Sequence, residues 1–373
     1  MKIALVADHV GPLSRSGEID AAAVPMAAAL ADRRHEVTLW THRAEVPAPA
    51  GVTMRTLPGH DGVRDIPTAA GELATTWAAD RPDVVHALSW TAGLTSLSAG
   101  RDLDIPLVQT FGDLARPGQP DATARSRLEA AIARSARLLV AQSTAAAADL
   151  GRRVSRVAVA MIPCGVDVDV FRPAALSAQR PPGPPRVVAL CPLTGEYGAD
   201  MAVRALRWAP HAELTIVGGP PPADLPTDPA AVRLSEEVVR CRVTGRVHLT
   251  GAIPDADLAE LLRCADLVVC PATSEPVGAG ALAALACGSP VLATDVDALS
   301  DIIAEQACGE LVPPRRPEDF GRALHDLLTD RTRLAGYRIV AADRALNYAW
   351  PRIASTLEAA YHQTVSHPSR AAV

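Results

Sequence analysis

The chain carries at Ala265–Thr294 the stretch ADLVVCPATSEPVGAGALAALACGSPVLAT. Two short apolar runs within it, Leu267–Cys270 and Val291–Ala293, are typical of buried strands. The small residues between them, Gly278–Cys287, predict a helix that can pack closely on a sheet. A strand, a helix and a second strand in this order predict two parallel strands joined by a crossover helix.

The same alternation extends over the rest of the chain. In the second half we expect further strands at Arg186–Leu190, Leu214–Gly218, Arg246–Thr250 and Gly309–Val312, with helices at Gly198–Trp208, Pro254–Cys264 and Pro317–Thr329. In the first half we expect strands at Lys2–Ala7, His35–Thr41, Val84–Leu88, Leu107–Phe111, Ala136–Ala141 and Val157–Ile162, with helices at Asp20–Asp32 and Ala122–Ser135. This spacing predicts an α/β protein with two doubly wound parallel sheets.

The proline-rich segment Arg172–Pro185 interrupts the pattern and predicts a domain boundary, because its prolines cannot lie inside regular elements. A chain of 373 residues also exceeds the length at which one core stops growing. We therefore predict an N-terminal domain at 1–175, a linker at 176–185 and a C-terminal domain at 186–345. Residues 346–373 are predicted to form a helix that packs back on the N-terminal domain, followed by a frayed tail.

The composition excludes several classes of protein. The net charge of −6 argues against a nucleic-acid partner. No apolar stretch is long enough to span a membrane, and the seven scattered cysteines, without a Cys-x-x-Cys pair, predict no zinc site and fit a cytoplasmic location. Lys2 is the only lysine, so an arginine would have to supply any side-chain cation that holds a phosphate.

Glu275 is predicted to follow the strand Leu267–Cys270, at the carboxyl edge of the sheet where doubly wound folds bind ligands. The backbone amides of Gly278, Ala279 and Gly280 would open the next helix toward the same place. Such a helix end can hold an anion without any charged side chain. The alternative is a helix whose capped end merely meets solvent.

Seven segments carry a resemblance to a known family, and they occur in the family's order. They are HEVTLWT (35–41), PDVVHALSW (82–90), PLVQTF (106–111), IPCGVDVDVFRP (162–173), LTIVGGP (214–220), HLTGAIPDADLAELLRCADLVVCP (248–271) and EPVGAGALAALACGSPVLAT (275–294). On these segments the chain resembles the retaining glycosyltransferases of family 4. The resemblance implies a GT-B fold, in which two Rossmann-like domains face a central cleft. It also implies a nucleotide-sugar donor in the C-terminal half, an acceptor in the N-terminal half, and neither a metal nor a cofactor.

The resemblance assigns roles to donor-side positions, several of which depart from the family pattern. Glu275 matches the glutamate that approaches the donor sugar, whereas Ala283 stands where a second glutamate grips the ribose. Pro192 and Tyr197 stand where an arginine and a lysine bind the diphosphate, and Glu196 adds a negative charge between them. The predicted donor-binding positions are Ser16, Gly17, Pro192, Tyr197, Gly218, Gly278, Ala279, Gly280 and Ala283, of which Ser16 and Gly17 replace a Gly-Gly pair.

In the N-terminal half, Gly112 stands where the family has a histidine near the reacting sugar, with Asp113 beside it as a candidate base. His9 follows the first predicted strand and is a second candidate base. His86 and Trp90 lie at strand ends, so we place them with Gly112 on the acceptor side, although His86 also fits a core position.

Two functions remain open. The first is a retaining glycosyltransferase that moves a sugar from a nucleotide-sugar donor to a small-molecule acceptor, with Glu275, Asp113 and His9 as catalytic candidates. The second is a non-catalytic pseudo-glycosyltransferase that binds a protein partner or a sugar ligand. Arginines that could replace the missing cations are Arg15, Arg240, Arg242 and Arg246, although the stretch containing the last three also fits a solvated helix and turn.

Overall fold

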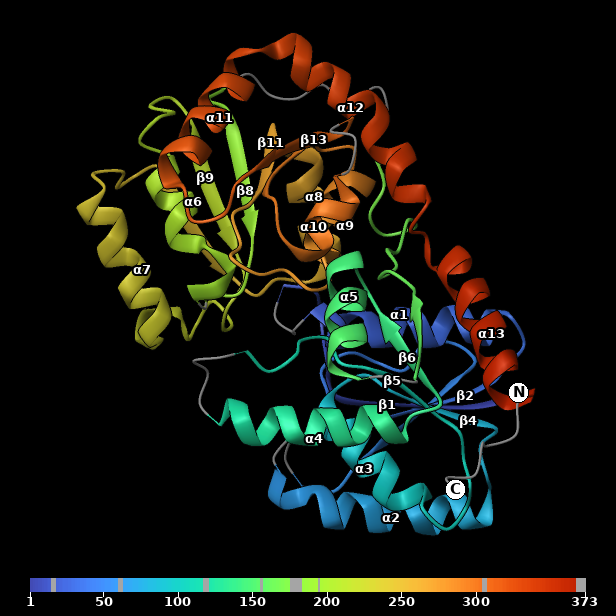
Figure 1. Cartoon of the computed structure of the whole chain (residues 1–373). Helices are drawn as coiled ribbons and strands as arrows, with labels where there is room; N and C mark the ends of the chain where they lie inside the picture. The colour runs from blue at the N-terminus through green and yellow to red at the C-terminus, as the bar shows by residue number, and fades with distance from the viewer. Residues whose placement is uncertain are drawn as a thin grey trace. The chain divides into compact units, whose positions relative to one another are not determined.

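The computed structural model describes residues 1–14, 18–59, 63–116, 121–154, 157–174, 183–193, 195–303 and 307–366. The chain forms two compact units (Figure 1). The N-terminal unit comprises Met1–Gly11, Glu18–Cys164 and Trp350–Val373, and the C-terminal unit comprises Pro12–Gly17 and Gly165–Ala349. The predicted linker 176–185 falls largely outside the described residues.

The N-terminal unit is built on a seven-stranded sheet with the order β3-β2-β1-β4-β5-β6-β7, in which every pair is parallel. Its strands are β1 (Lys2–Val10), β2 (Glu36–Ala44), β3 (Val52–Thr56), β4 (Val84–Ala87), β5 (Leu107–Thr110), β6 (Leu138–Ala141) and β7 (Ala158–Met161). Its helices are α1 (Glu18–Asp32), α2 (Ile66–Ala79), α3 (Trp90–Gly100), α4 (Ala122–Ser135), α5 (Thr144–Arg153) and α13 (Trp350–Ser366). The order of the strands reverses between β1 and β4.

The C-terminal unit repeats this plan with a six-stranded parallel sheet of order β10-β9-β8-β11-β12-β13. Its strands are β8 (Arg186–Leu190), β9 (Glu213–Val217), β10 (Val247–Gly251), β11 (Leu267–Cys270), β12 (Val291–Thr294) and β13 (Gly309–Val312). Its helices are α6 (Ala199–Ala205), α7 (Pro229–Arg240), α8 (Asp255–Cys264), α9 (Ala279–Ala286), α10 (Asp297–Ile302), α11 (Pro317–Thr329) and α12 (Arg331–Leu346). The two doubly wound sheets predicted from the sequence are thus confirmed.

Small side chains give the C-terminal unit its close packing. All eight residues of α9 are buried, and the helix contacts β11, β12, α8 and α12. A helix that is apolar on every side can be buried on every side. The alanines of α9 thus provide close packing in a chain that has few aromatic residues. None of the described helices combines the length and the hydrophobicity needed to cross a membrane.

Helix α13 belongs to the N-terminal unit, although it lies at the other end of the sequence. Glu358 accepts a hydrogen bond from Arg33 Nε at 2.7 Å on the surface. In the interior, Tyr361 Oη lies 2.6 Å from His86 Nδ1, and Thr110 Oγ1 lies 2.8 Å from His86 Nε2. Both ring nitrogens of His86 are therefore satisfied by buried hydroxyl groups, and burial lowers the pKa of this histidine from 6.5 to about 3.

The buried imidazole of His86 is expected to make stability depend on pH. The unfolded chain binds a proton at His86 below pH 6.5, whereas the folded chain stays neutral there down to about pH 3. His86 therefore contributes no penalty above pH 6.5. Below pH 6.5, acidification should lower the free energy of unfolding by about 1.4 kcal/mol per pH unit at this site. The free energy of unfolding is measured by urea titration at several pH values between 7 and 4. Its dependence on pH should be correspondingly weaker for His86→Gln than for the wild type. His362→Gln, which removes an exposed histidine, should keep the wild-type slope, and equal slopes for the wild type and His86→Gln would contradict the assignment.

Candidate active site

The candidate site of the C-terminal unit lies where its strand order reverses, between β8 and β11. Ligands of doubly wound sheets bind outside the carboxyl ends of the strands at this point. The segments that follow the two strands, 191–198 and 271–278, are tied together there. The backbone amide and the hydroxyl of Thr273 both donate to the carbonyl of Glu196, at 2.7 and 3.1 Å.

Two glycines allow these segments to come so close. Gly198 has a φ of +74°, and a Cβ atom at this position would lie 2.0 Å from the carbonyl oxygen of Pro271. Gly218, with a φ of +134°, would place a Cβ atom 2.2 Å from the carbonyl oxygen of Cys191. Real Cβ atoms do not approach backbone oxygens so closely, so both positions require glycine. Gly218, predicted as a donor-binding residue, therefore has a packing role next to the loop after β8.

Glu275 is fixed at its backbone and at its side chain. Its side chain is buried, with 6% of the residue exposed, and Oε1 accepts the amide of Gly278 at 3.3 Å. The Glu275 amide donates to Asp297 Oδ2 at 2.9 Å, and the Ser274 hydroxyl donates to the same oxygen at 2.7 Å. Asp297 has a φ of +42°, in the left-handed region that aspartate tolerates better than most residues. Glu275 is therefore a positioned buried carboxylate.

The amino-terminal end of α9 faces this carboxylate. Positive charge concentrates at such an end, because the first amide groups of a helix have no partner within it. In the structure the amide of Gly278 donates to Glu275, so the anion at this helix end is a side chain of the protein itself. The predicted phosphate cradle of Gly278, Ala279 and Gly280 thus already has one amide committed to Glu275.

The segments around Glu275 are acidic. Segments 191–198 and 271–278 contain Glu196 and Glu275 and no lysine, arginine or histidine. Burial raises the pKa of the Cys191 thiol to about 12, and the nearby carboxylates of Glu275 and Asp200 act in the same direction. Cys191 is therefore a neutral thiol, and a phosphate bound here would meet no cation from these two segments.

Three other predicted donor-side residues lie within the described part of the chain. Pro192 is half-buried two residues after the end of β8, and the half-buried Tyr197 packs against the hydrophobic core. Ala283 has no exposed surface within α9, so its methyl group offers no polar contact, and its place in the donor pocket stays a prediction. Ser16 and Gly17 lie outside the described residues.

Two of the four proposed replacement cations are occupied elsewhere, and one lies outside the described residues. Arg240 forms an ion pair with Glu237, and Arg246 Nη1 donates to the carbonyls of Ala209 and Ala212 at 2.9 and 3.0 Å. Arg242 lies in a turn after α7 with a φ of +57°. Arg15 lies outside the described residues.

In the N-terminal unit, the two candidate bases are paired with other side chains. His9 lies within β1 rather than after it, and its Nε2 is 3.5 Å from Glu45 Oε1. Asp113 accepts a hydrogen bond from Arg125 Nη2 at 2.8 Å. Asp113 is therefore held in an ion pair with Arg125, whereas His9 lies close to a carboxylate.

The three predicted acceptor-side residues separate into one core residue and two edge residues. His86 is completely buried, so it belongs to the core and not to an acceptor surface. Gly112 has a φ of +62°, and a Cβ atom there would lie 2.9 Å from Ile19 Cγ2. Trp90 begins α3, and the guanidinium carbon of Arg125 lies 5.8 Å from the centre of its ring.

Arg125 is the residue that the sequence analysis missed. It joins Trp90 and Asp113 at the carboxyl edge of the N-terminal sheet, and its Nε also donates to Glu129 Oε1 at 2.8 Å. The four-residue spacing of Arg125 and Glu129 in α4 predicts that pair. No spacing in the sequence predicts its contact with Trp90. Among the described residues, no group of three or more His, Cys, Asp or Glu side chains is arranged to hold a metal ion.

Comparison with known proteins identifies related sequences along nearly the whole chain. Residues 185–330 match the family model described as glycosyl transferases group 1, and residues 23–170 match the model described as glycosyltransferase family 4. A protein of Nocardia farcinica named D-inositol 3-phosphate glycosyltransferase is 30% identical, over 100% of this chain and 92% of its own length. A protein of the same name from Mycobacteroides abscessus is 29% identical, over 98% and 90%.

Solved structures share the fold over a similar extent. Sucrose-phosphate synthase from Thermosynechococcus elongatus superimposes with a TM-score of 0.88 at 22% identity, covering 97% of this chain and 98% of that one. HepE from Anabaena, solved in complex with UDP-glucose, superimposes with a TM-score of 0.81 at 18% identity, covering 97% and 100%. At these identities the likeness concerns the arrangement of the backbone.

Proposed function

Because the chain belongs to the group 1 and family 4 glycosyltransferases and has their GT-B fold, we propose that it transfers a sugar from a nucleotide-sugar donor to a small-molecule acceptor with retention of the anomeric configuration. The family and the fold confirm the resemblance inferred from the sequence. The UDP-glucose complex of HepE supports the donor class. The names of the relatives support a phosphorylated cyclitol as the class of acceptor to test first.

The observation that carries this proposal is the position of Glu275. A buried carboxylate, held by Gly278 and placed through Asp297, lies at the carboxyl edge of the sheet where a donor would bind. A carboxylate accepts hydrogen bonds from sugar hydroxyl groups, and charge-assisted bonds in a desolvated site are the strong ones. We assign to Glu275 the orientation of the donor sugar. The reaction needs no cofactor, since the nucleotide sugar is itself a substrate.

The departing diphosphate sets the main energetic demand of the reaction. Negative charge develops on this leaving group, and groups fixed in advance around it stabilise the transition state. Backbone amides would have to supply most of this stabilisation, because Pro192 and Tyr197 stand in place of the family's cations. We therefore expect slower transfer than in a relative that retains the arginine and the lysine.

The missing cations favour a second candidate function, a non-catalytic protein that binds a protein partner or a sugar ligand. Segments 191–198 and 271–278 contain no cation, and the position of the ribose-binding glutamate is a buried alanine, Ala283. Each lost charge-assisted hydrogen bond is worth about 1.5–3 kcal/mol, so a diphosphate would bind weakly.

A nucleotide panel distinguishes the two candidates. Thermal unfolding is measured with UDP, GDP, ADP and their glucose derivatives at millimolar concentration, and nucleotide release is assayed with D-inositol 3-phosphate as the acceptor. A ligand present at 100 times its dissociation constant adds about 2.7 kcal/mol of stability. We expect one of the three nucleotides to stabilise the protein, and the glucose derivative of that nucleotide to be turned over. Binding without turnover of any donor would support the non-catalytic candidate, and no stabilisation by any nucleotide would overturn the proposed donor class.

A further inference from the structure

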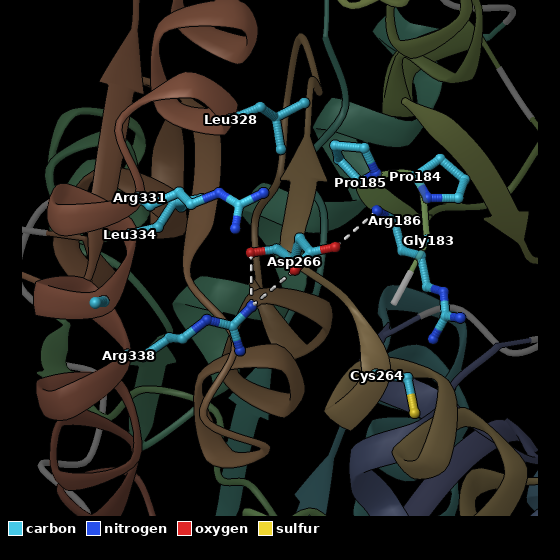
Figure 2. Close-up of a pocket in the computed structure, with 11 residues that line it drawn as sticks. Gly183, Pro184, Pro185, Arg186, Cys264, Asp266, Leu328, Arg331, Leu334 and Arg338 are labelled. Carbon is cyan, nitrogen blue, oxygen red and sulfur yellow. Dashed lines mark hydrogen bonds and ion pairs between the residues drawn. The ribbon is translucent and has the colours of Figure 1, made fainter. Parts of the chain in front are cut away.

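A pocket of about 420 Å³ lies at the amino-terminal edge of the C-terminal sheet. One wall contains Gly183–Arg186, where β8 begins, and Asp266, which directly precedes β11 (Figure 2). The opposite wall is a face of α12 together with the end of α11. Glu275 follows the other end of β11, so this pocket is separate from the candidate active site.

The face of α12 that lines the pocket carries two arginines. Arg331, Leu334, Ala335 and Arg338 occupy positions i, i+3, i+4 and i+7, which lie on one side of a helix. Figure 2 shows the guanidinium groups of Arg331 and Arg338 extending in the same direction, toward Asp266. The spacing thus directs two permanent positive charges into one pocket.

Arg338 and Asp266 form a fixed wall. Arg338 Nη2 donates to the carbonyls of Ala265 and Asp266 at 2.8 and 2.9 Å, and it lies 3.7 Å from Asp266 Oδ1. The other carboxylate oxygen of Asp266 accepts the backbone amide of Arg186 at 2.8 Å. The single carboxylate of the pocket is therefore engaged by Arg338 and by the start of β8.

The side chains of Arg331 and Arg186 have no such partners. Neither guanidinium group forms a hydrogen bond or an ion pair within the part of the chain that the structure describes. The two guanidinium groups of α12 thus face a pocket with one carboxylate, in a protein whose net charge is −6, whereas the Arg186 side chain is directed away from them in Figure 2. The amino-terminal end of α12 is already capped, because the Asp330 side chain accepts the Arg333 amide at 2.9 Å. The arginine side chains, and not the helix end, therefore supply the positive charge of the pocket.

We propose that this pocket binds a phosphomonoester dianion, with Arg331 as its main ligand and Arg338 adding positive charge beside it. The guanidinium fork of Arg331 matches the charge and the geometry of a phosphate. The volume suits a small molecule, and Leu328, Leu334 and Pro185 provide apolar surface beside the charges. Inorganic phosphate and a small organic phosphate ester share the required group, and the apolar wall favours the ester. The inference does not depend on the proposed sugar transfer.

Calorimetric titration tests this site directly. Inorganic phosphate and glucose 6-phosphate serve as probes, each titrated with and without saturating UDP so that binding at the candidate active site is recognised. Arg331→Ala is compared with Arg322→Ala, a matched change of an exposed arginine on α11 outside the pocket. We expect Arg331→Ala to weaken binding by about tenfold or more, because it removes a charge-assisted hydrogen bond, and Arg322→Ala to leave it unchanged.

Each outcome bears on the proposal. Tighter binding of glucose 6-phosphate than of phosphate, lost in Arg331→Ala and insensitive to UDP, would support an organic ligand. Equal affinities with the same loss would support free phosphate as the ligand. The proposal is overturned by no binding at millimolar concentration, by competition with UDP, or by equal weakening in the two variants. Arg331 is exposed, so its replacement should leave the fold intact, which the unchanged thermal unfolding of the variant would verify.

Discussion

Replacing Glu275 with glutamine is expected to lower the rate of sugar transfer by about 100- to 1,000-fold, with nearly unchanged affinity for the nucleoside diphosphate. Glutamine has the same shape and can still accept the Gly278 amide, so the loop should keep its conformation. It lacks the negative charge that strengthens hydrogen bonds to the donor sugar. The measurements are kcat/KM for the donor and the dissociation constant of the nucleotide, determined on the same protein preparation.

The control is Glu260→Gln, which removes an exposed carboxylate of α8 in the same unit and should leave both quantities unchanged. A transfer rate unaffected by Glu275→Gln would remove this residue from the reaction. Loss of nucleotide binding together with activity, accompanied by a lower unfolding temperature, would indicate that Glu275 supports the fold of the loop rather than the sugar.

The fold was predictable because its signals are local. The stretch Ala265–Thr294 contains a complete strand–helix–strand unit, and its apolar runs became β11 and β12. The edge strand β3 was missed, because Val52–Thr56 has one buried residue and no apolar run. Strands buried on both faces are conspicuous in a sequence, whereas a solvated edge strand resembles a loop.

The site was predictable only in part, because its contacts join distant segments. Glu275 could be placed at the end of a strand, but Asp297 lies 22 residues further along, and it reaches Glu275 because β11 and β12 end side by side. Similarly, the sequence left His86 open between the acceptor side and the core, and it could not show that Tyr361, 275 residues away, is the partner of the buried ring. Sequence spacing carries no information about such pairs until the order of the strands is known.

The junction of the loops after β8 and β11 provides the second large expected effect. Gly198→Ala should lower the free energy of unfolding by about 3–5 kcal/mol. A left-handed backbone costs a residue with a Cβ atom about 1–2 kcal/mol. The remainder arises because the new Cβ atom would lie 2.0 Å from the Pro271 carbonyl oxygen, a backbone atom that cannot move aside without breaking the contact between Thr273 and Glu196.

Gly245→Ala separates these two contributions. Gly245 also has a positive φ, +84°, but no atom lies within 4 Å of the position of an added Cβ, so this variant should pay only for the backbone conformation. Urea unfolding of both variants at the same pH gives the comparison. A difference of about 2 kcal/mol or more would measure the close approach of the two loops. Equal losses of unfolding free energy would mean that the loops after β8 and β11 move apart to accept a side chain at Gly198. Loops that move so easily could not hold Glu275 in the fixed position that its proposed role requires.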